Sequence, residues 1–185
     1  MERGPPFRLP GGGAMTILPL VAIDPGNIES AYAVIDAETC RPIAINKLTN
    51  DHLSLELPSM ASGAALPVVI EQIGHYGTGM PAGATVFDTC RWIGRFEQII
   101  IDAGGYAPRL VKRATVKAHL CGSAKAKDGN VIQALIDRFA RDERNHGKGT
   151  KAQPGFFYGF RADIWQAFAL AVYAADTLNT ERTLS

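Results

Sequence analysis

VAIDPGNIESAYAVID (residues 21–36) is the stretch that decides the fold of this chain. An almost unbroken apolar run from Ile17 to Ile23 stops at Asp24-Pro25-Gly26, which is typical of a buried strand followed by a tight turn. The segment from Ser30 to Ile35 alternates and predicts a second strand, and the segment from Arg41 to Leu48 predicts a third. Three consecutive strands with short connections predict an antiparallel meander.

Downstream of the meander, the apolar pattern changes. Residues 49–66 are weakly patterned and predict only a connection, whereas Leu66 to Ile70 predicts a buried strand that ends at Glu71-Gln72. The sequence then predicts a Gly-rich loop (74–83), a helix (84–103), a strand (106–111), a helical turn (116–120), an amphipathic helix (128–141) and an apolar helix (162–178). A meander feeding a β-α-β section predicts an α/β fold with a five-stranded mixed sheet flanked by helices.

Length and composition indicate one folded domain. The chain has 185 residues, of which 46% are hydrophobic and 20% charged, and no stretch is long enough to span a membrane. Residues 1–14 are rich in Pro and Gly and predict a disordered leader before a domain over 15–185. Three scattered cysteines, an odd number, predict reduced thiols in a cytoplasmic protein rather than disulfides or a zinc site: Cys40, Cys90 and Cys121.

Charge is segregated along the chain, although the net charge is only +1. Residues 15–108 hold 4 Lys or Arg and 10 Asp or Glu, whereas residues 109–151 hold 11 Lys or Arg and 4 Asp or Glu. A basic segment of this kind is a candidate surface for a phosphate backbone. The alternative is the solvated face of an ordinary helix, and charge alone leaves both interpretations open.

Three carboxylates lie directly beside apolar segments that are expected to be buried. Asp24 ends the first apolar strand, Glu71 ends the fourth, and Asp163 opens the last apolar helix. An unpaired buried carboxylate is costly, so each needs a partner. If the first and fourth strands are parallel neighbours and the last helix packs beside them, the three side chains converge. Converging carboxylates require a cation, and oxygen ligands favour Mg²⁺ or Mn²⁺ over zinc.

Each of these carboxylates also has an ordinary structural interpretation. An Asp in an Asp-Pro-Gly turn commonly accepts hydrogen bonds from the backbone, and Asp163 has the position of a helix N-cap. Glu71 could pair with an arginine. The order of all three along one β-β-β-β-α-β-α plan is what favours a shared site.

The same residues resemble those of a known family, the RuvC Holliday-junction resolvases of the RNase H-like superfamily. VAIDPGNIESAYAVID (21–36) looks like the opening strand, aspartate and turn of those enzymes, and VVIEQ (68–72) looks like their I-E-Q strand end. Residues 111–139 are similar to their basic stretch, and RADIWQAFALAVYAAD (161–176) is similar to their final helix. The resemblance spans residues 17–178, and the PGFFYGF and D-x-W-Q-A forms look closer to phage and prophage members.

The resemblance implies an RNase H-like fold and a metal site. Asp24, Glu71 and Asp163 match the family's catalytic, metal-binding carboxylates, which work with two Mg²⁺ or Mn²⁺ ions. The family often has a second acidic or His/Asp position three residues along the last helix, where this chain has Gln166. A neutral amide binds Mg²⁺ more weakly, so Gln166 either completes a looser metal site or orients a water molecule. Asp128 is a possible substitute ligand, and its alternative role is a helix N-cap.

Further residues are expected to contact DNA. Five cations after the fifth strand are suited to phosphate contacts: Lys112, Arg113, Lys117, Lys125 and Lys127. The resemblance implies that one lysine near the site stabilises transition-state charge. Lys127 and Lys125 are both candidates for this catalytic role, and the choice between them stays open. His75 and Tyr76 follow Glu71 in the Gly-rich loop, where related enzymes present an aromatic that stacks at the junction. Trp92 and Trp165 lie on apolar helical faces and are expected in the core.

The resemblance predicts a crossover junction endodeoxyribonuclease that acts on branched DNA. Two symmetric cuts require two active sites, so a homodimer is expected, with helix 84–103 as an interface element. A non-catalytic nucleic-acid-binding protein on the same fold and an RNase H-type hybrid nuclease are the alternatives. A phosphotransferase of the actin-like fold would need a second similar domain, for which 185 residues are too few.

Overall fold

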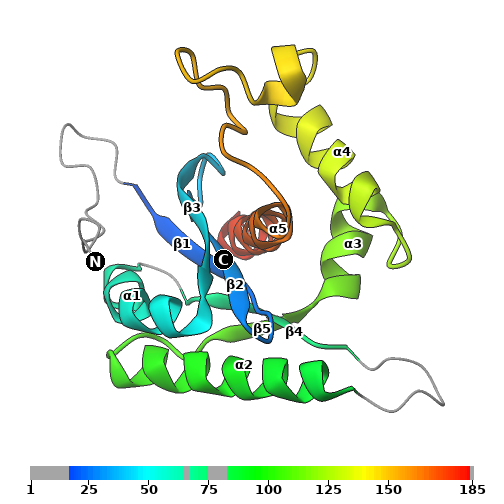
Figure 1. The fold of residues 1–185 in the computed structure, drawn as a ribbon. Helices are drawn as coiled ribbons and strands as arrows, with labels where there is room; N and C mark the ends of the chain where they lie inside the picture. Colours follow the sequence, from blue (N-terminus) through cyan, green and yellow to red (C-terminus); the bar gives the residue numbers. More distant parts are fainter. Residues whose placement is uncertain (1–16, 65–66, 75–82, 184–185) are drawn as a thin grey trace.

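A five-stranded mixed sheet forms the centre of the protein (Figure 1), as the sequence predicts. The computed structural model describes residues 17–64, 67–74 and 83–183. The strands are β1 (Pro19–Asp24), β2 (Glu29–Asp36), β3 (Pro42–Thr49), β4 (Val69–Gln72) and β5 (Arg109–Lys112), in the spatial order β3-β2-β1-β4-β5. The first three strands pair antiparallel, whereas β4 runs parallel to both β1 and β5. The predicted meander and β-α-β section are confirmed.

One face of the sheet is covered by α5 (Ile164–Thr183), with α3 (Arg113–Cys121) and α4 (Asp128–Phe139) beside it (Figure 1). Leu20 and Ala22 of β1 point to this face and belong to the same core as the buried side of α5. Small residues let the helix approach the sheet closely, since α5 buries five alanines almost completely: Ala167, Ala169, Ala171, Ala174 and Ala175. A short 3-10 helix, η1 (Arg144–Gly147), lies between α4 and α5.

The opposite face is covered by α1 (Asn50–Gly63) and α2 (Ala84–Asp102). Alternate β1 residues, Val21 and Ile23, point to this second core together with Phe96 of α2. Both faces are therefore buried, which explains why β1 is apolar throughout instead of alternating apolar and polar residues.

The prediction of an unstructured connection over residues 49–66 is wrong, because α1 occupies most of it. Leu53, Leu57 and Met60 recur at helical spacing and are almost completely buried. Pro58 inside the helix and the exposed Leu55 obscure that spacing in the sequence. Tertiary burial of one side outweighs the weak helical signal.

Other expectations are confirmed with small shifts of boundary. The predicted turn at residues 116–120 is the nine-residue helix α3, and the last helix begins at Ile164 and extends to Thr183. Trp165 is buried, and Trp92 packs against the second core. The three cysteines are free. Among the described residues, no helix combines the length and apolar character needed to cross a membrane. The predicted leader, residues 1–14, lies outside the described residues.

Candidate metal and nucleic-acid site

Asp24 and Glu71 are brought together by the register of two parallel strands. Ala22 of β1 pairs with Val69 of β4, and Ile23 pairs with Ile70. Asp24 and Glu71 are the next residues along each strand. Side chains alternate between the faces of a sheet, so Asp24 shares the face of Ala22 and Glu71 that of Val69, which is the α5 face. The predicted meeting of these two carboxylates follows from this geometry.

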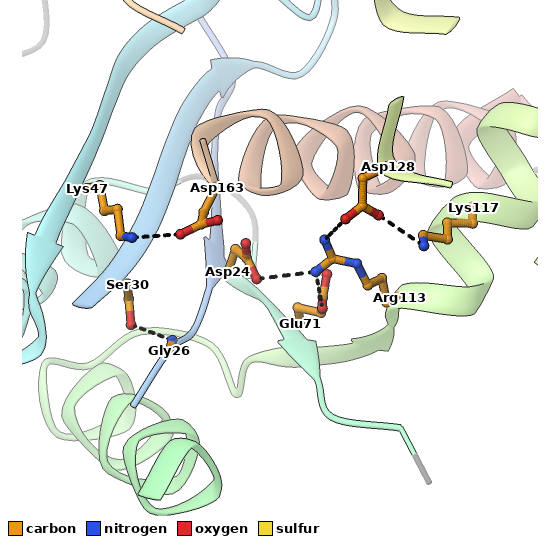
Figure 2. A network of polar contacts seen from close by, with 9 residues as sticks. All are labelled: Asp24, Gly26, Ser30, Lys47, Glu71, Arg113, Lys117, Asp128 and Asp163. Carbon is orange, nitrogen blue, oxygen red and sulfur yellow. Dashed lines mark hydrogen bonds and ion pairs between the residues drawn. The ribbon is translucent and has the colours of Figure 1, made fainter. Parts of the chain in front are cut away.

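Arg113, the first residue of α3, lies between the two carboxylates (Figure 2). Its Nη1 atom is 3.1 Å from Oε1 of Glu71 and 3.9 Å from Oδ1 of Asp24. Because both distances end on the same nitrogen, the two oxygens lie within about 7 Å of each other, the sum of the two lengths. The sequence predicts that Arg113 contacts phosphate. Its guanidinium instead pairs with Asp24 and Glu71, which together with Asp128 form the acidic centre of the protein.

Asp128 holds the other side of the same guanidinium. Its Oδ2 atom is 3.2 Å from Nη2 of Arg113, and its Oδ1 atom is 3.0 Å from Nζ of Lys117. Lys127 occupies the N-cap position of α4, so Asp128 is the first helical residue and not the cap. Lys117 is therefore turned towards a protein carboxylate, although a phosphate contact was expected for it.

Asp163 lies at the start of α5, close to the pair but turned towards another partner. Its backbone carbonyl accepts hydrogen bonds from the N–H groups of Gln166 and Ala167, which is the backbone role of an N-cap. Its side chain instead forms a 2.7 Å ion pair with Nζ of Lys47 on β3 (Figure 2). The preceding residue, Ala162, has a φ of 41°, a left-handed conformation that is strained for alanine.

The two paired carboxyl groups are electrostatically destabilised as anions. The pKa of Asp24 is raised to about 8, chiefly by burial and then by the charges of Glu71 and Asp163, against the lowering effect of Arg113. Burial also raises the pKa of Glu71, against the lowering effect of Arg113. For Asp128, burial raises the pKa, but the Lys117 hydrogen bond and the Arg113 charge outweigh it and leave the pKa lowered. Asp24 and Glu71 are thus disfavoured as anions, whereas Asp128 is favoured as one.

The donor set at this centre fits a hard divalent cation. Asp24 and Glu71 offer carboxylate oxygens on adjacent strands, and a cationic nitrogen already lies between them. Within the described residues, no three Asp, Glu, His or Cys side chains form a ready ligand cluster. The Asp163 carboxylate is paired with Lys47, and those of Asp24 and Glu71 contact Arg113. Gln166 is a buried residue three positions beyond Asp163, in the first turn of α5.

A buried clamp of three hydrogen bonds, which the sequence pattern does not reveal, fixes the turn after Asp24. The Gly26 N–H donates to Oγ of Ser30 at 3.2 Å, and the Ser30 hydroxyl donates to Oδ1 of Asn50 at 2.6 Å. Nδ2 of Asn50 donates back to the carbonyl of Gly26 at 2.9 Å. Ser30 and Asn50 are each 1% exposed, so the ring of three hydrogen bonds is shielded from water. Nothing in the sequence marks two polar residues 20 positions apart as partners.

A groove of about 540 Å³ opens beside the acidic centre. Its lining comes from the ends of β4 and β5 and the start of α3: Glu71, Gln72, Ile73, Gly74, Lys112, Arg113 and Ala114. Lys112, Lys125 and Lys127 are exposed, as phosphate contacts require. His75 and Tyr76, the predicted stacking residues, lie outside the described residues.

Sheet order, strand directions and covering helices define the class of this protein as an α/β domain of RNase H-like fold. Its structure is similar to that of Thermus thermophilus RuvC, with a TM-score of 0.60 and 15% identity over 88% of this chain and 96% of that one. It is also similar to T. thermophilus RuvC in complex with Holliday junction substrate, with a TM-score of 0.65 and 13% identity over 89% and 96%. No protein-family profile and no curated protein sequence matches the chain. At this identity, the similarity shows the fold.

Proposed function

We propose that this protein is a metal-dependent endonuclease that cuts branched DNA, with four-way junctions as its substrate. The observation that carries the proposal is the pair Asp24 and Glu71, whose side chains are only 11% and 14% exposed, face one side of the sheet and both contact Nη1 of Arg113. A pair of this kind serves structural stability poorly, because both carboxyl groups are disfavoured as anions. The solved structure with a Holliday junction substrate supports the choice of substrate.

Asp24 and Glu71 would hold the ions, and Asp163 would join them after release from Lys47. Two divalent ions would supply activation of water and stabilisation of the leaving oxygen. Gln166 or Asp128 would complete the site. A lysine from the loop before α4, Lys127 or Lys125, would approach the scissile phosphate, since both are exposed.

The exposed lysines of the basic segment would contact the phosphate backbone and position the DNA along the groove. A homodimer would present two such sites for paired cuts, with α2 as the expected interface element. The phage-like form of the final helix, with Gln166 in place of an acidic residue, favours a member that diverges from the cellular enzymes.

Cleavage of labelled DNA by the full-length protein tests this proposal. Substrates are a four-way junction, the matched linear duplex and an RNA–DNA hybrid, each with EDTA, Mg²⁺ or Mn²⁺. We expect metal-dependent, paired cuts in the junction by the wild type and by the control Asp137→Asn, an exposed residue of α4. Asp24→Asn should lose at least about a hundredfold in rate.

Three outcomes would contradict the proposal. Junction binding without cleavage in any metal would favour the non-catalytic DNA-binding alternative. Preferential cleavage of the hybrid would favour an RNase H-type nuclease. Cleavage that survives Asp24→Asn unchanged would place the activity elsewhere or in a contaminant.

A further inference from the structure

Arg113 has an unusual position for a residue in the basic segment of the chain. Its guanidinium contacts three carboxylates, those of Asp24, Glu71 and Asp128, and only 35% of its side chain is exposed. The three acidic residues come from three different elements, β1, β4 and α4. A surface arginine whose main role is to contact DNA would keep its N–H groups free to bind phosphate. The contacts indicate instead a role inside the acidic centre.

A guanidinium and a divalent ion compete for the same oxygens at this place. Nη1 of Arg113 is within hydrogen-bonding distance of Glu71 and 3.9 Å from Asp24, so one cationic nitrogen contacts both expected ligands. Like charges at such short separations repel strongly where burial reduces screening. Metal binding therefore requires Nη1 to withdraw from both carboxylates.

Asp128 provides a place for the displaced guanidinium. It contacts the other terminal nitrogen, Nη2, and its second oxygen is fixed by Lys117. Arg113 can therefore give up its Nη1 contacts and keep the contact with Asp128. Both Glu71 and Arg113 line the groove beside the centre, so a withdrawn Nη1 stays next to the expected path of the phosphate.

We propose that Arg113 is the resident counter-ion of the acidic centre and competes with divalent metal, and that Asp128 is the positioning residue that retains Arg113 when metal enters. This inference rests on the proposed function, because it concerns the same metal site. It assigns Asp128 to the arginine rather than to the ion. Metal affinity then depends on how readily Arg113 leaves Asp24 and Glu71 while it keeps its contact with Asp128.

Calorimetric titration with Mn²⁺ alone, without DNA, tests the inference through a double-mutant cycle. The proteins are wild type, Arg113→Gln, Asp128→Asn and the double variant, measured near pH 8.5 so that proton release does not mask binding. We expect Arg113→Gln to bind Mn²⁺ about tenfold more tightly than wild type, because the competing cation is gone. Arg113→Lys should resemble the wild type. Arg41→Gln, an exposed change at the opposite end of the sheet, is the charge-matched control.

The cycle separates the two roles of Asp128. If Asp128 acts through Arg113, Asp128→Asn weakens Mn²⁺ binding several-fold in the wild-type background but less than about twofold in the Arg113→Gln background. An equal loss in both backgrounds would make Asp128 a metal ligand and overturn its assignment to Arg113. Mn²⁺ affinity unchanged by Arg113→Gln would overturn the competition itself.

Thermal unfolding in EDTA and in Mn²⁺ gives a second readout. We expect Arg113→Gln to lower Tm in EDTA, where the carboxylates lose their counter-ion, and to show a larger rise in Tm on adding Mn²⁺. A purely structural arginine would lower Tm in both conditions alike. If the wild type cleaves junctions but Arg113→Gln binds Mn²⁺ no more tightly, only this inference fails. If no variant binds Mn²⁺, the proposed function fails with it.

Discussion

Asp24, a proposed ligand, is at the scale of one residue a carboxyl group held where its anion is unfavourable. Its carboxyl group is buried next to Glu71, and burial together with that second charge raises its pKa to about 8. The ordinary value of 3.8 applies to the unfolded chain. Between these two values, the folded state binds more protons than the unfolded state. The free energy of unfolding therefore decreases as pH rises through this interval.

Asp24→Asn should consequently make the protein more stable while removing its activity. At about pH 8.5 we expect the variant to gain on the order of 1–3 kcal/mol in free energy of unfolding, since a neutral amide avoids the buried charge. Near pH 4 the gain should vanish, because Asp24 is then protonated in the wild type as well. Urea unfolding at both pH values measures the difference. Equal stability at pH 8.5 would show that Asp24 is not electrostatically disfavoured.

The residues of the site could be predicted to different extents. Asp24 and Glu71 stand at the ends of apolar strands, so strand order and the period of two residues were enough to expect them side by side. Arg113 could be recognised only as a basic residue, because its partner Glu71 lies 42 positions away. Pairings over such distances depend on side-chain directions, which the pattern of apolar residues does not specify. The Lys47 contact of Asp163 escaped prediction for the same reason.

The junction between strand and helix determines the site at the scale of elements. Asn50 is the first residue of α1, yet it hydrogen-bonds both Ser30 of β2 and the carbonyl of Gly26. Through this contact the start of α1 fixes the turn that follows Asp24. The position of one proposed ligand, Asp24, thus depends on a helix that the sequence pattern did not reveal.

Asn50→Ala should destabilise the protein and loosen this turn. We expect a loss of about 2–3 kcal/mol in free energy of unfolding, because Ser30 and the Gly26 carbonyl lose buried partners. Asn46→Ala on β3, whose side chain is only partly buried, is the matched control and should cost under about 1 kcal/mol. Urea unfolding at neutral pH compares them. Equal losses in both variants would show that the buried clamp has no special role.

The strands were easier to predict than the helices that cover them. β1 and β2 are apolar runs bounded by turn residues, a pattern that predicts strands. Their limits differ by only a residue or two from those predicted. α1 has buried Leu53, Leu57 and Met60 at helical spacing, but the proline inside it lowers its intrinsic propensity. Its helical state depends on packing against α2 and the sheet.

Charge segregation acts at the scale of the whole molecule. The acidic residues 15–108 include β1 to β4, α1 and α2, and the basic segment, residues 109–151, runs from β5 through α3, α4 and η1. These basic elements lie next to the acidic centre (Figure 2). Acidic and basic side chains are thus adjacent, as the proposed nuclease site requires.

The salt dependence of DNA binding tests this arrangement. Lys125 and Lys127 are exposed in the loop between α3 and α4. We expect their joint replacement by alanine to reduce the slope of log K against log salt by about two, one for each lost phosphate contact. Fluorescence anisotropy with a four-way junction in Ca²⁺ measures the slope, and Arg41→Ala serves as control. An unchanged slope would remove these lysines from the DNA surface.

The central claim is that Asp24 and Glu71 share a divalent ion. Anomalous scattering from crystals of the full-length protein soaked in Mn²⁺ tests this most directly, because it locates the ion without reference to activity. We expect an anomalous peak between the two carboxylates at about 2–2.5 Å from an oxygen of each, with Nη1 of Arg113 withdrawn, and no peak in Glu71→Gln crystals. Wild-type crystals that bind Mn²⁺ elsewhere, or not at all, with Arg113 still between Asp24 and Glu71, would contradict the account.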